Sequence, residues 1–245
     1  MKIINLASGS KGNCTLIKLD KINVMIDIGL PMSNLTKRLD KAIPKIDLLI
    51  ITHTHVDHIK GLKSIVKEQN PEIYTLEEKL SEKVVSNKIN VQNIIENDNL
   101  YIELFELSHD VKCAGVYLKY KDEELVYITD TGYVRDKLLN KYKNKDIYII
   151  ESNYEEDILR HGKYPYHLQQ RILSSKGHIS NKDSVRYLKT LIGDKTKYIM
   201  LAHLSEENNA PEVVEQHISK LLEKIEYKPE KVILNQNEKT EVSIW

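Results

Sequence analysis

Short apolar stretches of strand length recur along the chain, and polar turns separate them. The stretch 46–51 is continuously apolar, which is typical of a strand buried on both faces between helical layers. Residues 8–13 form a glycine-rich turn between two of the early stretches. We predict strands over the following ranges: 1–6, 14–19, 24–28, 46–51, 101–107, 115–119, 125–128, 147–150 and 198–201.

Apolar residues at helical spacing mark three further segments. One amphipathic helix is predicted by these positions: Ile59, Leu62, Ile65 and Val66. Ser180 and Asp183 resemble an acidic variant of the capping box, and the helix that follows them ends near Gly193. A third helix begins at Pro211, and its apolar stripe includes His217. We therefore predict that His217 is a core histidine with satisfied hydrogen bonds and not a metal ligand.

Polar segments that carry histidine repeatedly follow the ends of the predicted strands. Mixed α/β folds usually place their active sites at such strand ends. The chain has 245 residues, which is enough for one well-buried domain, and it contains no linker, internal repeat or low-complexity segment. We predict a mixed α/β chain that forms a single domain over residues 1–245.

The charge and composition of the chain limit the kinds of binding partner that we expect. Lys+Arg and Asp+Glu each number 36, so no global field favours nucleic acid or an anionic membrane, and any polyanion must be held by a local patch. The first six residues are too short and too polar for a signal peptide, and no run approaches the roughly 20 apolar residues that cross a bilayer. Cys14 and Cys113 fit reduced thiols. We expect a cytoplasmic protein without a membrane partner; the sequence does not indicate its oligomeric state.

A cluster of metal-ligating residue types directly follows the apolar stretch that ends at position 51. His53, His55, Asp57 and His58 lie within six residues. At the end of an extended strand, residues two apart point to the same side, so His53 and His55 can bind one ion together, while the following turn redirects Asp57 and His58. Two sub-sites are implied. Imidazole and carboxylate suit Zn, Mn or Fe, and there is no thiolate cluster for a structural zinc site.

Four short motifs, in this order along the chain, resemble those of the metallo-β-lactamase superfamily. They are His-x-His-x-Asp-His at 53–58, Ser-His-Asp at 108–110, Thr-Asp-Thr at 129–131 and Ala-His-Leu at 202–204. The resemblance implies a four-layer αββα sandwich, in which two mixed β-sheets are flanked by helices. It also implies two divalent metal ions per chain with the following ligands: His53, His55 and His109 for one ion, Asp57, His58 and His203 for the second, and Asp130 as a bridge between them.

The chemistry of a two-metal site explains why these residue types are needed. Two divalent ions about 3.5 to 4 Å apart can generate a bridging hydroxide at neutral pH and clamp the attacking and leaving oxygens of a displacement. Asp57 would also orient that hydroxide. The ligating histidines must be neutral at the nitrogen that faces the metal, so acid should release the metals and abolish activity together. Zn, Mn and Fe all accept this donor set, so the metal stays open.

Further segments resemble one bacterial branch of the superfamily, known as the YycJ or WalJ type. They are Leu-Ala-Ser-Gly-Ser-Lys-Gly-Asn-Cys-Thr at 6–15, Glu-Ser-Asn-Tyr at 151–154, Leu-Arg-His-Gly-Lys-Tyr-Pro at 159–165, Gly-His-Ile-Ser-Asn at 177–181 and His-Leu-Ser-Glu-Glu-Asn-Asn at 203–209. This resemblance implies a metal-dependent hydrolase of phosphodiester bonds. It implies a DNA exonuclease that works from the 5′ end and is linked to DNA repair and cell-wall signalling.

A basic interval lies inside this otherwise neutral chain: Arg160, His161, Lys163, Arg171, Lys176 and His178. Such a patch can hold phosphates near metals, so Arg160 and Lys163 are candidate substrate contacts; the alternative is a solvated helix face. His178 precedes the Ser180 cap and therefore lies near a helix N-terminus, which favours anions. We predict that His178 contacts the scissile phosphate or protonates the leaving oxygen. The alternative is a loop histidine bonded to backbone.

The glycine-rich turn supplies three more candidates for substrate binding. Ser8, Ser10 and Asn13 either support the ligands or meet the substrate, because such a turn exposes backbone donors; the alternative is an ordinary hairpin loop. Tyr164 and Tyr166 have the chemistry to stack on a terminal base, and core packing is the alternative for both.

Other functions on the same fold stay open, because the fold serves many hydrolyses. They include an RNA endonuclease, a cyclic phosphodiesterase, a thioesterase and a lactonase. The chain has no Gly/Pro-rich arm of the kind that RNA-processing relatives use, and it lacks the secretion signal expected for β-lactam hydrolysis. A non-catalytic regulatory partner of a kinase pathway is disfavoured by the complete set of seven ligands.

Overall fold

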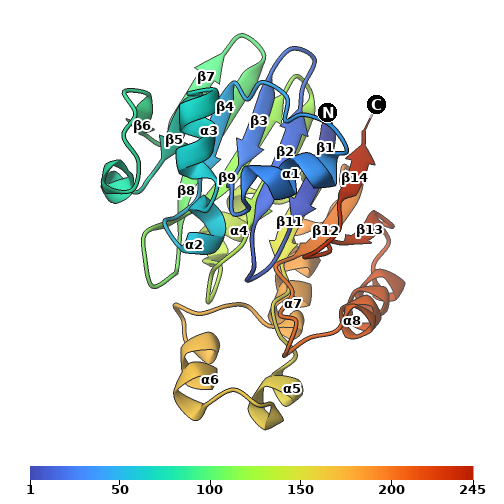
Figure 1. Cartoon of the computed structure of the whole chain (residues 1–245). Helices are drawn as coiled ribbons and strands as arrows, with labels where there is room; N and C mark the ends of the chain where they lie inside the picture. Colours follow the sequence, from blue (N-terminus) through green and yellow to red (C-terminus); the bar gives the residue numbers. More distant parts are fainter. Residues whose placement is uncertain (245) are drawn as a thin grey trace.

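The computed structural model describes residues 1–244, whose strands form two sheets that lie face to face (Figure 1). In the first sheet, β1, β2 and β3 are antiparallel neighbours, whereas β3 to β6 are parallel. Its strands, in spatial order, are β14 (Thr240–Ser243), β1 (Lys2–Ala7), β2 (Cys14–Lys18), β3 (Asn23–Ile26), β4 (Leu48–Ile51), β5 (Glu72–Thr75) and β6 (Ile89–Val91).

The second sheet also combines antiparallel and parallel pairs. β7 to β10 are antiparallel neighbours, whereas β10 to β13 are parallel. Its strands, in spatial order, are β13 (Glu230–Ile233), β12 (Tyr198–Ala202), β11 (Ile147–Glu151), β10 (Glu123–Ile128), β9 (Cys113–Tyr120), β8 (Leu100–Leu107) and β7 (Ile94–Asn97).

Helices cover the outer faces of both sheets. α1 and α3 cover the first sheet, and α4, α7 and α8 cover the second, while α5 and α6 extend away from the sheets (Figure 1). The helices are α1 (Met32–Leu39), α2 (Val56–Ile59), α3 (Leu62–Glu68), α4 (Asp136–Lys141), α5 (Glu156–His161), α6 (Tyr166–Leu173), α7 (Asn181–Leu191), α8 (Pro211–Lys224) and the 3-10 helix η1 (Glu78–Glu82).

Three apolar clusters hold these four layers together. The central cluster joins side chains of both sheets, such as Ile50 of β4 and Ile149 of β11. Outside the first sheet, Leu49 packs with the helical residues Leu35 and Ile65. The alternation within β4 sends Ile50 inward and Leu49 outward, so this strand is buried on both faces, as its continuous apolar sequence predicts. The predicted αββα sandwich is confirmed.

Polar residues follow the carboxyl ends of strands that run in one direction. β3 is parallel to β4, and β10, β11 and β12 are parallel. β8 has the same direction as β10, because both are antiparallel to β9. The ends of these strands therefore bring the following residues to one edge of the sandwich: Asp27 after β3, His53 after β4, His109 after β8, Asp130 after β10, Glu151 at the end of β11 and His203 after β12.

The sequence predictions for the elements are largely confirmed, with two corrections. All nine predicted strands are present, and the Ser180 side chain accepts from the backbone N–H of Asp183 at the start of α7. The helix predicted from Ile59 is divided into α2 and α3 at Gly61, whose backbone donates to Ile28. His217 was predicted in the core, but its side chain is 33% exposed and its Nε2 lies 2.9 Å from a carboxylate oxygen of Glu155.

Candidate metal centre

The first group of possible metal donors consists of three histidines. One nitrogen from each of His53, His55 and His109 lies within 4.8 Å of the other two. The His53 ring centroid is 4.6 Å from that of His55 and 5.1 Å from that of His109. Burial, and then the nearby His58 ring, hold the pKa of His53 well below its ordinary value. His53 is therefore neutral and can offer a lone pair to a cation.

The second group combines a carboxylate with two histidines. Donor atoms of Asp57, His58 and His203 also lie within 4.8 Å of one another. Nε2 of His58 is 3.5 Å from Oδ2 of Asp57, and both imidazoles are buried. The structure thus brings together residues that are almost 150 positions apart in the sequence.

Asp130 lies between the two groups. Its Oδ2 is 3.4 Å from Nε2 of His58, and its Oδ1 is 3.5 Å from Nε2 of His203. Another grouping places it with His53 and His58. Burial raises the pKa of Asp130, but the His203 and His58 rings outweigh that effect and hold the pKa well below its usual value. A charged carboxylate therefore occupies the middle of the cluster.

Several donor atoms of this cluster are buried without a hydrogen-bond partner among residues 1–244. They include Nε2 of His53, Nε2 of His203 and Oδ2 of Asp130. A buried polar atom without a partner costs roughly 1–3 kcal/mol, and a bound cation would remove that cost. Neutral imidazoles and carboxylates are also the donors that divalent Zn, Mn and Fe accept. The residues present therefore fit divalent metal binding.

Asp27 orients His58 through the ring nitrogen that faces away from the other candidate ligands, and the sequence did not predict this role. The Asp27 side chain is fully buried, and its Oδ2 lies 2.7 Å from Nδ1 of His58. It also accepts from the backbone N–H and the hydroxyl of Thr52, at 2.8 Å each. Burial opposes the protonated form of His58, but Asp27 and Asp130 raise its pKa to about 9. The available signal was an acid directly after an apolar strand.

Glu151 is the second residue of the site that was not predicted from the sequence. Its buried Oε1 is 2.7 Å from Nδ1 of His178 and 2.8 Å from Nδ1 of His203. One carboxylate therefore fixes the orientation of two imidazoles. Burial opposes the protonated form of His203, but Asp130 and Glu151 raise its pKa to about 10. Like Asp27, Glu151 is an acid at the end of an apolar strand.

The glycine-rich turn between β1 and β2 lies against the cluster. Ser8 is buried, and its hydroxyl accepts from the backbone N–H of His203 at 2.7 Å. Nδ2 of Asn13 lies 2.9 Å from Nε2 of His58 and 3.2 Å from Oδ2 of Asp57. Ser10, in contrast, is exposed and lines cavities beside the cluster. Ser8 and Asn13 thus contact the candidate ligands, and Ser10 faces the space where a substrate would lie.

A cavity of about 190 Å³ opens beside the cluster on the side of α6. His109, His178 and His203 line it from the cluster, and Tyr164 and Arg171 line it from the α5–α6 segment. The cavity therefore joins candidate metal donors to one aromatic side chain, which can stack on a ring, and one cationic side chain, which can pair with an anion.

The remaining predicted contacts in the α5–α6 segment lie away from this cavity. Arg160 forms an exposed ion pair with Glu156 at 2.6 Å, and Lys163 is exposed. Tyr166 is 75% exposed and does not line the cavity. Arg171 lies 2.5 Å from Asp110, which ties α6 to the segment after β8. The substrate contacts expected at Arg160 and Lys163 stay predictions.

The fold and this geometry define the class of protein. The model of the beta-lactamase superfamily domain matches residues 22–203, a span that includes every candidate metal donor described above. The chain therefore belongs to the metallo-β-lactamase superfamily, whose fold implies divalent metal binding.

Two relatives place the chain within that superfamily. It is 36% identical over 223 residues to exodeoxyribonuclease WalJ of Streptococcus pneumoniae serotype 2 (strain D39 / NCTC 7466), a match that covers 85% of this chain and 83% of WalJ. It is 33% identical over 231 residues to exodeoxyribonuclease YycJ of Bacillus anthracis, a match that covers 89% of this chain and 88% of YycJ. The chain belongs to the family of these two proteins, as its sequence motifs predict.

Solved structures show the same fold at low sequence identity. The metallo-beta-lactamase fold protein YhfI from Bacillus subtilis has a TM-score of 0.72 at 18% identity, covering 99% of this chain and all of YhfI. The short form of human tRNase Z has a TM-score of 0.66 at 16% identity, covering 100% of this chain and 99% of that one. Within residues 1–244, no helix has the length and apolar character that a membrane crossing requires.

Proposed function

We propose that the protein is a metal-dependent nuclease that hydrolyses phosphodiester bonds in DNA, as an exonuclease that starts from the 5′ end, in the cytoplasm. The observation that carries the proposal is the joint geometry: two groups of donors meet at Asp130, directly beside a cavity that contains His178 and Arg171. The exodeoxyribonuclease relatives support the choice of DNA.

The proposed cofactors are two divalent ions. One would be held by His53, His55 and His109, the second by Asp57, His58 and His203, with Asp130 between them, which agrees with the two groups of close donor atoms. When bound, the ions would activate water at neutral pH and polarise the phosphoryl oxygens. Zn, Mn and Fe all suit this donor set.

The chain's own residues would handle the protons. Asp57, whose side chain is 25% exposed at the margin of the cluster, would orient the attacking water. The bond between Glu151 and Nδ1 of His178 leaves Nε2 of that ring available to donate a proton to the leaving oxygen. Arg171 would contribute positive charge toward a phosphate in the same cavity.

The shape of the cavity beside α6 supports action at the end of a strand. Its volume of about 190 Å³ is small, and Tyr164 and Leu168 line it together with the candidate metal donors. Tyr164 offers a face on which a terminal base would stack. A short end of DNA fits this description better than the interior of a duplex does.

The test is hydrolysis of 5′-labelled single-stranded and duplex DNA with added Mn²⁺ by the native protein and by His55→Ala. His55 is partly exposed, so its loss removes a donor without opening the core. We expect metal-dependent release of labelled mononucleotides, and we expect the variant to lose it. If the metal-loaded native protein leaves DNA intact and hydrolyses thioester or lactone reporters, the proposal is wrong.

A further inference from the structure

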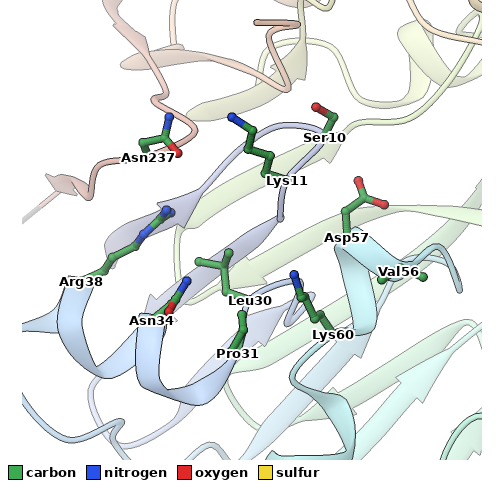
Figure 2. A pocket seen from close by; sticks show the side chains of 10 residues that line it. All are labelled: Ser10, Lys11, Leu30, Pro31, Asn34, Arg38, Val56, Asp57, Lys60 and Asn237. Carbon is green, nitrogen blue, oxygen red and sulfur yellow. The ribbon is translucent and has the colours of Figure 1, made fainter.

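A second, larger cavity lies on the side of the cluster where Asp57 stands. Its volume is about 440 Å³, and Asp57 is part of its lining. Figure 2 shows that Lys11 comes from the turn between β1 and β2, Arg38 from α1, and Lys60 from the end of α2, with the Lys60 amine directed into the cavity. The mechanism proposed above uses none of these three cations.

A third cavity lies beyond Lys60. Its volume is about 420 Å³, and Val56 and Lys60 line both this cavity and the previous one. Lys63 of α3 and Lys83, which directly follows η1, add two more cations to its lining. The two cavities share Val56, the first residue of α2, and Lys60, which directly follows α2. We therefore call them together the α2 groove. Asp57 lines the first of these cavities, and no residue of α6 lines either one.

The lining of the α2 groove carries more positive than negative charge, although the whole chain has equal numbers of acids and bases. It contains two carboxylates, Asp57 and Glu82, and the following cations: Lys11, Arg38, Lys60, Lys63 and Lys83. Lys11 is paired with Glu206, and Arg38 donates to the backbone carbonyls of Leu6 and Gln236. The other three cations are different. Within residues 1–244, the following amines have no ion pair or side-chain hydrogen bond: Lys60, Lys63 and Lys83.

An apolar side chain stands among these cations. Val56 is 71% exposed at the place where the two cavities meet. A strand of nucleic acid presents alternating phosphates and apolar sugar or base faces, so spaced amines around an exposed apolar side chain match its chemistry. One compact anion would need only one of the two cavities.

We propose that the α2 groove holds the phosphodiester backbone of the DNA strand that remains attached to the protein after cleavage. This inference rests on the proposed nuclease function and adds a direction to it. The short end would occupy the cavity of about 190 Å³ beside His178 and α6, and the longer strand would leave past Asp57 and Lys60. Contacts by lysine amines to phosphates carry little sequence information, so binding in the groove is independent of base sequence.

The test measures binding of a phosphorothioate-linked single-stranded oligonucleotide, which resists hydrolysis, to the metal-loaded protein by fluorescence anisotropy at several salt concentrations. Lys60→Ala removes one proposed phosphate contact. We expect its Kd to rise about fourfold near physiological salt and its salt slope to fall by about 0.7. Adding Lys63→Ala and Lys83→Ala should enlarge both effects.

Lys67→Ala is the matched control, because Lys67 is an exposed lysine of α3 that lines neither cavity of the groove. It should bind like the native protein. Metal content and the midpoint of thermal unfolding, measured for each variant, identify any loss of folding. If Lys60→Ala and the triple variant, both folded and metal-loaded, bind the oligonucleotide with native Kd and salt slope, the inference is overturned.

Two further measurements separate this inference from the proposed function. If the native protein releases nucleotides from ordinary DNA while the groove variants bind normally, the nuclease function stands and the α2 groove fails. If the native protein does not cleave DNA, the nuclease function fails. If inorganic phosphate binds in a Lys60-dependent manner but lengthening the oligonucleotide adds no affinity, the groove is a small-anion site and the strand path is wrong.

Discussion

Three polar residues at the edge of the sandwich have left-handed backbone conformations, which residues other than glycine rarely adopt. Asp27 and Asp130 have φ of 58°, and His203 has φ of 56°. Asp27 and His203 directly follow β3 and β12, and Asp130 is the second residue after β10. The unusual backbone turns each side chain out of the strand direction and into the cluster. Such conformations cost on the order of 1–3 kcal/mol each and are typical of functional sites.

Glu151→Gln tests the residue that links His178 to His203. The amide keeps the size of the side chain but removes the negative charge that both rings contact. We expect kcat for DNA hydrolysis to fall about 10- to 100-fold, as for other residues that orient metal ligands. The pKa of His203 should also fall in the metal-free protein, which NMR titration measures. Glu156→Gln, on the exposed surface of α5, is the control, and equal activity of both variants would refute the role of Glu151.

Gly29→Ala tests how closely the chain packs around Asp57. A β-carbon at Gly29 would stand 1.6 Å from the backbone oxygen of Asp57, so α2 must move away. We expect a loss of stability of about 1–3 kcal/mol, together with weaker metal binding. Denaturant unfolding and metal titration measure the two effects. Ser64→Ala, at an exposed position of α3, should change neither; native metal affinity in Gly29→Ala would contradict the assigned packing.

At the scale of elements, α6 differs from the other helices in how little of it is buried. α6 has no buried residue among its eight positions, and Arg171 ties it to the segment after β8 through Asp110. A helix that buries no side chain in the core makes few stabilising contacts. The side chains of α6 are therefore free to line the cavity beside the metal donors, as Leu168 and Arg171 do. Tyr164, just before α6, contributes to the lining of the cavity.

Tyr164 and Tyr166 form a matched pair of aromatic residues for a test of base stacking. Tyr164 lines the cavity, whereas Tyr166 is 75% exposed and does not. Stacking on one base contributes about 1–3 kcal/mol, so Tyr164→Ala should raise KM for single-stranded DNA at least about fivefold. Tyr166→Ala should leave KM unchanged. Steady-state kinetics on both variants decide the point; a larger effect at Tyr166 would reverse the assignment.

Glu124 of β10 is a buried acid that contacts Tyr117 of β9 and Lys145, which precedes β11, and its effect on stability depends on pH. Burial opposes the charged form of Glu124, but Lys145, at 2.7 Å, and Tyr117 outweigh it and lower the pKa. A lowered pKa stabilises the fold above the unfolded-state value of about 4.3, and that contribution is lost as the pH falls through the lower, folded-state value.

Glu124→Gln should therefore be less stable than the native protein at neutral pH and should lose this difference in acid. Chemical unfolding from pH 7 down to the acid limit of the fold measures the change. Glu223→Gln, at an exposed position of α8, should track the native protein at every pH. A destabilisation that stays constant across the whole range would show that packing, and not charge, is what Glu124 contributes.

At the scale of the whole molecule, the candidate ligands connect the two sheets. His53 follows β4 of the first sheet, whereas His109, Asp130 and His203 follow strands of the second. Metal removal should therefore loosen the sandwich as well as abolish activity. We expect chelation to lower the midpoint of thermal unfolding, and we expect added metal to restore it. An unchanged midpoint after verified metal loss would show that the sheets do not depend on the ions.

The sequence predicted the strands well because they leave local patterns, whereas the αββα sandwich and the ligand set were implied by the resemblance of its motifs to the metallo-β-lactamase superfamily. The sandwich is confirmed, and the ligand set stays a prediction that agrees with the groups of close donor atoms. The strands appear as apolar runs, and His53, His55 and His58 lie close together in the chain. Asp27 and Glu151 were missed because a single acid after a strand has no local partner, and its role depends on which strand lies next to it. The α2 groove was missed for a similar reason, because its cations come from distant segments: the turn between β1 and β2, α1, the end of α2, α3 and the residue after η1.

The order of the cluster along the chain has a consequence during synthesis on the ribosome. The donors from His53 to Asp130 are translated first, but Glu151, His178 and His203 follow later, and β12 must pair with β11 before His203 reaches Asp130. The partly synthesised polypeptide therefore contains His53, His55 and His109 before it contains His203. Residues 1–151 therefore cannot form the complete cluster, and β12 is the strand that completes it.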